Sequence, residues 1–276
     1  MKIAEPKTYF LPNLNGNISH VAECASICYN STPTNATDMY NKLIARRHMS
    51  MLRHATHYFC VPTNKLGAYY QQYFRANPYC GIVKENKFFF IVLNGQFFHE
   101  NVELIKKSGI LDYPSEEVAF YYNRETIRLL RLTFIVDTQI AITRELNRVS
   151  PNNIAERSTR FIDFLRKLGI RFSAPHWLGS LNLYRRVLAK VLLRIASASY
   201  RIARSKYGIN LRPEDARYFL PLGTESRVAY TYTIAEWLEI VEKRYHDTTG
   251  KAHPDCKIAV KPIHDKIHEI LSQYDA

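Results

Sequence analysis

The longest helical pattern in the chain covers Leu181–Tyr207, where apolar residues recur mostly at three- and four-residue steps. Gly208 follows directly and predicts a glycine C-cap. A second amphipathic helix is expected over Thr233–Tyr245, with Trp237 on its apolar side. Arg212-Pro213-Glu214-Asp215 predicts another helix start, because proline suits a first turn and acids suit the positive end of the helix dipole.

The first quarter of the chain predicts shorter elements. Ile18–Tyr29 mixes small and apolar residues at a spacing that fits either a strand or a helix. Thr37-Asp38 is a helix start, and the apolar stripe that follows it ends near His48. A further short helix is expected over Met51–His57.

The middle of the chain predicts strands. Lys87–Leu93, then Asn94-Gly95 and Gln96–Phe98, predict a hairpin, because Asn-Gly tolerates the positive φ values of a two-residue turn. Leu132, Phe134 and Val136 alternate as in a strand, which should run into a helix over Ile140–Leu146. Together the elements indicate an α+β fold, in which a small sheet packs with long helices.

No repeat, low-complexity segment or Pro/Gly/Ser-rich linker divides the 276 residues, so one domain over 1–276 is expected. The longest apolar stretches, such as Phe88–Leu93, fall far short of the roughly 20 residues that a membrane span requires. The first ten residues lack a secretory apolar region. These features predict a cytoplasmic protein with no membrane segment.

The five cysteines include no C-x-x-C pair, and Cys24 and Cys28 lack a second pair or nearby histidines, so no metal site is expected. The net charge of +13 favours polyanionic partners: nucleic acid, phosphorylated small molecules or an anionic membrane surface. The lysines and arginines within 185–206 stand at helical spacing among apolar residues, which favours a solvated helix face over a nucleic-acid groove. No phosphate-loop, dinucleotide-fold, nucleophile-elbow or zinc-protease motif occurs.

The segment Thr143–Phe161 is the strongest candidate for chemistry, because it combines four arginines with the small hydroxyl residues Ser158 and Thr159. Guanidinium groups and hydroxyls together suit a phosphate. A surface cluster of salt-bridged arginines accounts for the same composition equally well.

Within this segment, Glu156-x-Ser158-x-Arg160-Phe161 resembles the end of the signature R-H-R-x-x-S-x-N-E-x-S-x-R-Y of the flavin-dependent thymidylate synthases, also called the thymidylate synthase-complementing family. Other segments resemble further family motifs in the same order along the chain. They are Cys24–Tyr29, His48–His54, Asp215–Pro221, Trp237 with Arg244, and Gly250–Pro254. Asn77-Pro78-Tyr79 and Leu93–Asn101 fall where members with a long insertion carry similar elements, which places the insertion at about 60–130.

This resemblance implies a fold, a reaction and an assembly. The fold would be the thymidylate synthase-complementing fold, with a small mixed or antiparallel sheet. The reaction would be C5 methylation, or a related one-carbon alkylation, of a uracil nucleotide such as dUMP or UMP. FAD would be the cofactor, and NADPH and methylenetetrahydrofolate would be co-substrates. The enzyme would be a homotetramer whose sites are shared between subunits, with no nucleophile from the protein.

Carried over position by position, the resemblance implies two groups of site residues. The nucleotide-binding group is Glu145, Glu156, Ser158, Arg160, Arg227 and Arg244. The flavin-binding group is His54, Arg148 and Ser150.

The chain departs from the family pattern mainly in the flavin half. Arg148-Val149-Ser150 stands in place of R-H-R, and Arg53 replaces the glutamate beside His54. Asn153, Ala155, Glu145 and Phe161 also differ from the family residues. Weaker FAD binding is therefore expected. The alternatives to the enzyme are a non-catalytic or altered-specificity pyrimidine nucleotide-binding homologue and, with no motif behind it, a nucleic-acid binder.

Overall fold

The computed structural model describes residues 2–150, 152–165 and 169–274. Its central sheet has the strand order β2-β7-β10-β8. The two middle strands, β7 (Arg131–Gln139) and β10 (Glu225–Thr233), pair antiparallel over their full nine residues. The edge strands β2 (Lys7–Leu11) and β8 (Ile154–Glu156) are also antiparallel to their neighbours.

The two faces of the central sheet are covered by different helices. The main core joins Phe134, Val136 and Val228 on one face to α10 and α11. Trp237 of α10 is buried there and its Nε1 donates to the Leu132 carbonyl. Ile135 and its neighbours on the opposite face pack on α1. The covering helices are α1 (Gly16–Tyr29), α7 (Ile140–Asn147), α10 (Ile234–Arg244) and α11 (Pro254–Leu271).

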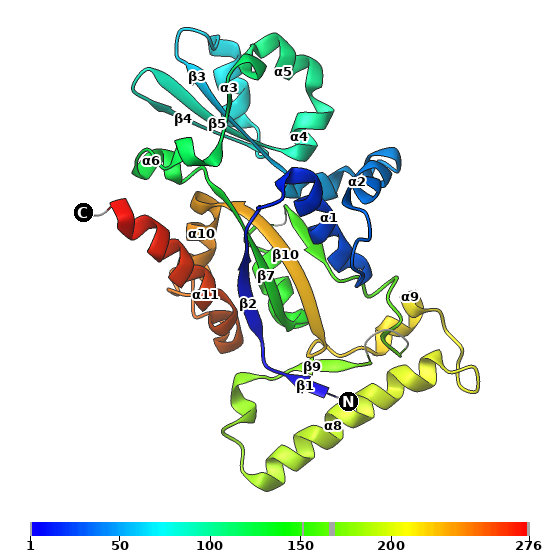
Figure 1. Ribbon diagram of the computed structural model, residues 1–276. Helices are drawn as coiled ribbons and strands as arrows, with labels where there is room; N and C mark the ends of the chain where they lie inside the picture. The colour runs from blue at the N-terminus through cyan, green and yellow to red at the C-terminus, as the bar shows by residue number, and fades with distance from the viewer. Residues whose placement is uncertain (1, 151, 166–168, 275–276) are drawn as a thin grey trace.

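A second antiparallel sheet, with the order β4-β5-β3-β6, lies at the upper end of the molecule in Figure 1. Its strands are β3 (Thr56–Pro62), β4 (Cys80–Glu85), β5 (Phe88–Asn94) and β6 (Pro114–Ser115). The helices of this region are α3 (Ala68–Ala76), α4 (Gly95–Glu100), α5 (Val102–Ser108) and α6 (Arg124–Ile127). Phe90 and Val92 of β5 belong to the main core, so the two sheets share apolar packing.

At the lower end of Figure 1, β1 (Lys2–Ala4) pairs parallel with β9 (Arg171–Ser173), and the long helix α8 (Leu183–Arg204) runs across the molecule beside them. α9 (Pro213–Ala216) and the 3-10 turn η6 (Arg217–Phe219) follow. α8 buries only Ser197, Tyr200 and Ala203. Its apolar stripe is exposed, and includes Tyr184, Leu188, Val191, Leu192, Ile195 and Ile202.

The remaining short elements connect the longer ones or follow the last of them. They are α2 (Ala36–Ala45), the 3-10 turns η1 (Met49–His54), η2 (Ile110–Asp112), η3 (Glu117–Phe120), η5 (His176–Leu178) and η7 (Ser272–Tyr274). Among the described residues, no helix is long and apolar enough to cross a membrane.

The α+β fold expected from the sequence is confirmed, but the predicted hairpin is wrong. β5 pairs with β4, and the turn between them contains Asn86 at φ 52°. Asn94 instead caps α4 by accepting from the backbone N–H of Phe97. A Cβ on Gly95 would lie 2.5 Å from the Leu52 carbonyl oxygen, so this glycine permits a close approach of backbone. Asn-Gly therefore marks a helix start and a tight contact.

Other local predictions need smaller corrections. Ile18–Tyr29 lies in a helix, and the short helix expected over Met51–His57 is the 3-10 turn Met49–His54, because His57 belongs to β3. Gly208 is not the C-cap of α8, since the helix ends at Arg204 and Ser205 caps it. A Cβ on Gly208 would lie 2.2 Å from the Ile202 carbonyl oxygen, which explains the glycine.

Candidate functional site

A cleft of about 1880 Å³ opens beside β8, between η1 and the segment that contains α9 and η6. Its charged lining is mixed but rich in guanidinium groups. The arginines are Arg47, Arg144, Arg157, Arg160 and Arg217, and the acids are Glu100, Glu156, Glu214 and Asp215. Such a lining can bind an anionic ligand and also hold one acidic group in place.

Glu156, at the end of β8, is held by two hydroxyl groups. Its Oε1 accepts from Thr143 Oγ1 at 2.8 Å and from Ser226 Oγ at 2.8 Å. Thr143 and Ser226 are both buried. The hydroxyls fix the orientation of the carboxyl group at the wall of the cleft, because each hydrogen bond takes up one of its acceptor positions.

Ser158 organises the loop that follows β8. Its Oγ accepts from the backbone N–H groups of Arg160 and Phe161, each at 3.1 Å. Its own N–H donates to the Cys28 carbonyl and so ties the loop to the end of α1. Since the Oγ acts as acceptor in both bonds, the hydroxyl proton is available to donate into the cleft.

Arg160 is exposed to 59% and pairs with an acid on the opposite wall. Its Nε donates to Glu214 Oε2 at 3.0 Å, and its guanidinium lies 5.2 Å from the centroid of the Phe161 ring. The hydrogen bond from Arg160 lowers the pKa of the Glu214 carboxyl. Arg160 is therefore positioned in the cleft by an acid that an incoming anion would have to replace.

The other arginines of the cleft differ in how far their charge is neutralised. Arg157 is buried and pairs with Glu225 at 3.5 Å, and burial lowers its pKa. Arg144 and Arg217 are exposed, and neither side chain has a hydrogen bond or ion pair with any described residue. Arg217 was not singled out from the sequence, although it is the arginine of the Asp215–Pro221 motif.

Three of the residues expected to bind the nucleotide lie elsewhere. Arg227 follows Ser226 on β10 and faces the opposite side of the sheet, where it makes two 2.7 Å hydrogen bonds with Asp137. The pKa of Arg227 is raised by this pair. Arg244 donates to the Glu145 carbonyl at 3.2 Å, and Glu145 lines a different cavity of about 220 Å³.

The three residues expected to bind flavin lie in different environments within one chain. His54 is 0% exposed and its Nδ1 lies 2.7 Å from Thr231 Oγ1. Burial, then the nearby His20 and arginines, holds its pKa well below the usual value, so it is neutral. Arg148 is exposed at the end of α7, and the Ser150 carbonyl accepts from the Tyr232 hydroxyl at 2.6 Å.

The cleft contains one thiol, from Cys28. Burial, with a smaller effect of Glu156, raises the pKa of Cys28 to about 11, so the group is protonated at neutral pH. A protonated thiol is a poor nucleophile.

Residues 116–271 match the family model for "Thymidylate synthase complementing protein", which is more than half of the chain. The chain belongs to the thymidylate synthase complementing protein family. No curated protein matches the sequence.

Two kinds of solved structure are similar in fold. PolB, a UMP/dUMP methylase from Streptomyces cacaoi bound with 5-Br UMP, is 14% identical, with a TM-score of 0.46 over 99% of this chain and 95% of that chain. Thymidylate synthase X from Helicobacter pylori, with FAD and dUMP, is 16% identical, with a TM-score of 0.39 over 53% of this chain and 73% of that chain.

Removal of one of the two hydroxyl groups that donate to Glu156 should lower the stability of the protein. Thr143→Val keeps the shape of a buried side chain but leaves the carboxylate one donor short, so the free energy of unfolding should fall by about 1.5–3 kcal/mol. Urea unfolding measures this. Thr143→Ser keeps the hydroxyl and should lose less. Unchanged stability of Thr143→Val beside a loss in Thr143→Ser would show that the methyl group matters, and not the hydrogen bond.

Proposed function

We propose that the chain binds a uracil nucleotide such as dUMP or UMP and alkylates its C5, in the reaction that flavin-dependent thymidylate synthases perform. One observation carries the proposal. Glu156, Ser158 and Arg160, the family signature residues retained here, lie together on one wall of an arginine-lined cleft. Ordinary surface salt bridges would not require this grouping of an anchored carboxyl, a hydroxyl donor and a guanidinium.

The phosphate of the nucleotide would bind at the loop after β8. Ser158 can donate its hydroxyl proton, and Arg160 offers a planar set of N–H donors. Arg144 and Arg217 add positive charge to the cleft, because neither side chain forms an ion pair with a described acid. The acceptor groups of Glu156 suit the polar edge of a base or sugar, whereas they would repel the phosphate.

A complete site would need a second copy of the chain. Arg227, Arg244 and Glu145 are on other surfaces of the same chain, as expected for sites shared between subunits. The exposed apolar stripe of α8 offers an interface. A homotetramer satisfies both features, because closed symmetry is the usual way to repeat one interface.

The family implies FAD, with NADPH and methylenetetrahydrofolate as co-substrates, and FAD would supply the hydride chemistry. The residues present in one chain do not form an open flavin site, because His54 is fully buried. No step of the reaction is therefore assigned through the flavin. The chain's own residues would bind and orient the nucleotide.

A non-catalytic pyrimidine nucleotide-binding homologue is the second candidate. It is favoured by one observation: the nucleotide half of the signature lies in a cleft, whereas the flavin half does not. Nucleotide binding is common to both candidates, and flavin binding separates them.

The nucleotide assignment is tested with Arg160→Ala. Loss of a charged hydrogen bond costs about 1.5–3 kcal/mol, so the affinity for dUMP or UMP should fall by roughly tenfold or more. Isothermal calorimetry measures this. Arg212→Ala is the matched control, since Arg212 also pairs with Glu214 but does not line the cleft. Equal affinities for wild type and Arg160→Ala would refute the assignment.

The assembly is tested by light scattering, which should give about four times the chain mass of 32.2 kDa. Leu192→Glu places a charge in the exposed stripe of α8 and should reduce the mass. Lys190→Glu lies on the same helix away from the stripe and should leave it unchanged. A wild-type mass of one chain at working concentration would contradict the homotetramer.

The flavin is tested by titration of FAD, followed by absorbance or fluorescence. The protein should bind FAD at micromolar levels, which corresponds to about 8 kcal/mol. Val149→His with Ser150→Arg should bind it more tightly, since a guanidinium can contact the pyrophosphate. Val149→His alone is the control for lost core packing, because Val149 packs against the main core. If neither wild type nor double variant binds FAD while nucleotide binding persists, the non-catalytic candidate is correct.

A further inference from the structure

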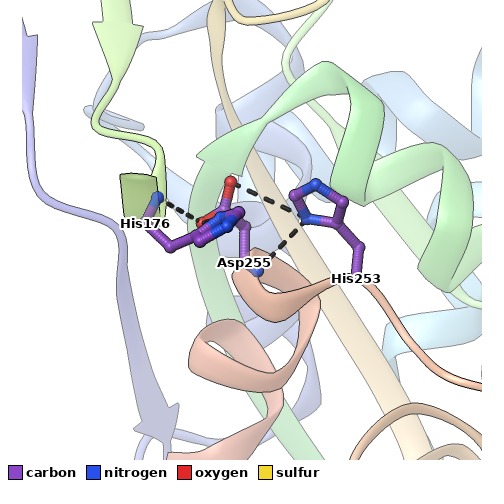
Figure 2. Close-up of side chains that lie close together, drawn as sticks. All are labelled: His176, His253 and Asp255. Carbon is purple, nitrogen blue, oxygen red and sulfur yellow. Dashed lines mark hydrogen bonds and ion pairs between the residues drawn. The ribbon is translucent and has the colours of Figure 1, made fainter. Parts of the chain in front are cut away.

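His176, His253 and Asp255 come together on the side of the molecule where β9 and the start of α11 meet. His176 begins η5, His253 caps α11 and Asp255 lies in the first turn of that helix. Figure 2 shows the three side chains close together, with the His176 ring overlapping the Asp255 carboxylate in this view and the His253 ring to its right. One nitrogen of each histidine and a carboxylate oxygen all lie within 4.8 Å of one another. None of the three residues lines the arginine-rich cleft.

The carboxylate is rigidly held. Asp255 is 2% exposed. Its Oδ1 accepts from the backbone N–H of His176 at 2.7 Å, and its Oδ2 accepts from Gln139 Nε2 at 2.6 Å. Hydrogen bonds of this kind from neighbouring groups fix the ligands of many metal sites and tune their affinity.

The imidazole of His253 presents a lone pair to this carboxylate. Its Nδ1 accepts from the backbone N–H of Asp255 at 3.2 Å, so it carries no proton. The same Nδ1 lies 3.8 Å from Asp255 Oδ2, and no proton lies between these two acceptors. On the other side, His176 Nδ1 lies 3.1 Å from Oδ1. A cation between the three groups would interact favourably with all of them.

The spacing fits a small transition-metal ion. With metal–ligand bonds of about 2.0–2.1 Å, ligand atoms of a tetrahedral zinc site are roughly 3.3 Å apart. The separations of the histidine Nδ1 atoms from the Asp255 oxygens, 3.1 Å from His176 to Oδ1 and 3.8 Å from His253 to Oδ2, lie close to this value. Binding would need only small side-chain movements, the release of the His176 proton and the loss of the long bond to the Asp255 N–H.

We propose that His176, His253 and Asp255 bind one divalent transition-metal ion of the zinc class. Two imidazoles and one carboxylate suit Zn²⁺ or Co²⁺, whereas Mg²⁺ and Ca²⁺ prefer oxygen ligands throughout. His253 and Asp255 also line the 220 Å³ cavity, which leaves room for a fourth ligand such as water. Both histidines are exposed and give the ion a path of entry. The site goes beyond the proposed function, which uses no metal.

The test is a titration of the chelator-treated full-length protein with Zn²⁺, followed by calorimetry, and with Co²⁺, followed by its visible absorption. Wild type should bind one equivalent at micromolar levels or more tightly, and Co²⁺ should show the intense bands of tetrahedral coordination. His176→Gln and His253→Asn should each weaken binding at least tenfold. Asn at position 253 can still cap α11, so the helix start is preserved.

Two further variants separate this site from other metal binding. Gln139→Leu removes a bond to Asp255 and should weaken binding by about 10–100-fold without removing a ligand. His264→Gln removes a partly exposed histidine elsewhere on α11, where the rings of His264 and His268 lie 5.9 Å apart, and should leave Zn²⁺ binding unchanged. The proposal is overturned if no Zn²⁺ binds below about 100 µM. It is also overturned if His264→Gln abolishes binding while His176→Gln retains it. Thermal unfolding of each variant without metal confirms that it is folded.

Discussion

The antiparallel pairing of β7 with β10 is the constraint on which the rest of the structure depends. The nine-residue register places each β10 residue opposite a fixed β7 partner, and the alternation of side chains assigns neighbours to opposite faces. Ser226 therefore contacts Glu156 in the cleft, while the adjacent Arg227 pairs with Asp137 on the other face. A shift of one residue would exchange these environments and expose the apolar residues that α10 and α11 cover.

Ion pairing within the chain, more than composition, decides which positive charges are available to a ligand. The net charge of +13 predicts anionic partners, but several arginines are already committed to acids of the chain. Within the cleft, the arginines that can respond to a ligand are those with exposed side chains. Arg144 and Arg217 are exposed and unpaired by side chain, and Arg160 is paired at an exposed position. The cleft beside β8 is thus a more specific basis for the proposed nucleotide binding than the overall excess of basic residues.

Sequence patterns predicted helices better than strands. Thr233 and Glu236 form a reciprocal cap at the start of α10, and Pro213 opens α9, so these local signals gave the correct element. The hairpin predicted at Asn94-Gly95 was wrong because asparagine is common both in turns and at helix starts. The structure uses Asn94 as a helix cap, and Gly95 packs closely against the Leu52 carbonyl, a contact distant in sequence. β10 went unpredicted because most of its residues are buried, which removes the polar alternation of a half-exposed strand.

The sequence by itself determined the family, the α+β class and the retained signature residues, because motif order and local periodicity are properties of the chain. Only the tertiary structure decided which of those residues share a site. Glu156, Ser158 and Arg160 meet at one cleft, whereas His54 is buried beneath the sheet and Arg227 faces away. His176 and Asp255, far apart in sequence, are neighbours. The physical reason is that strand register and helix packing set side-chain direction and burial, and both depend on contacts between segments distant in the chain.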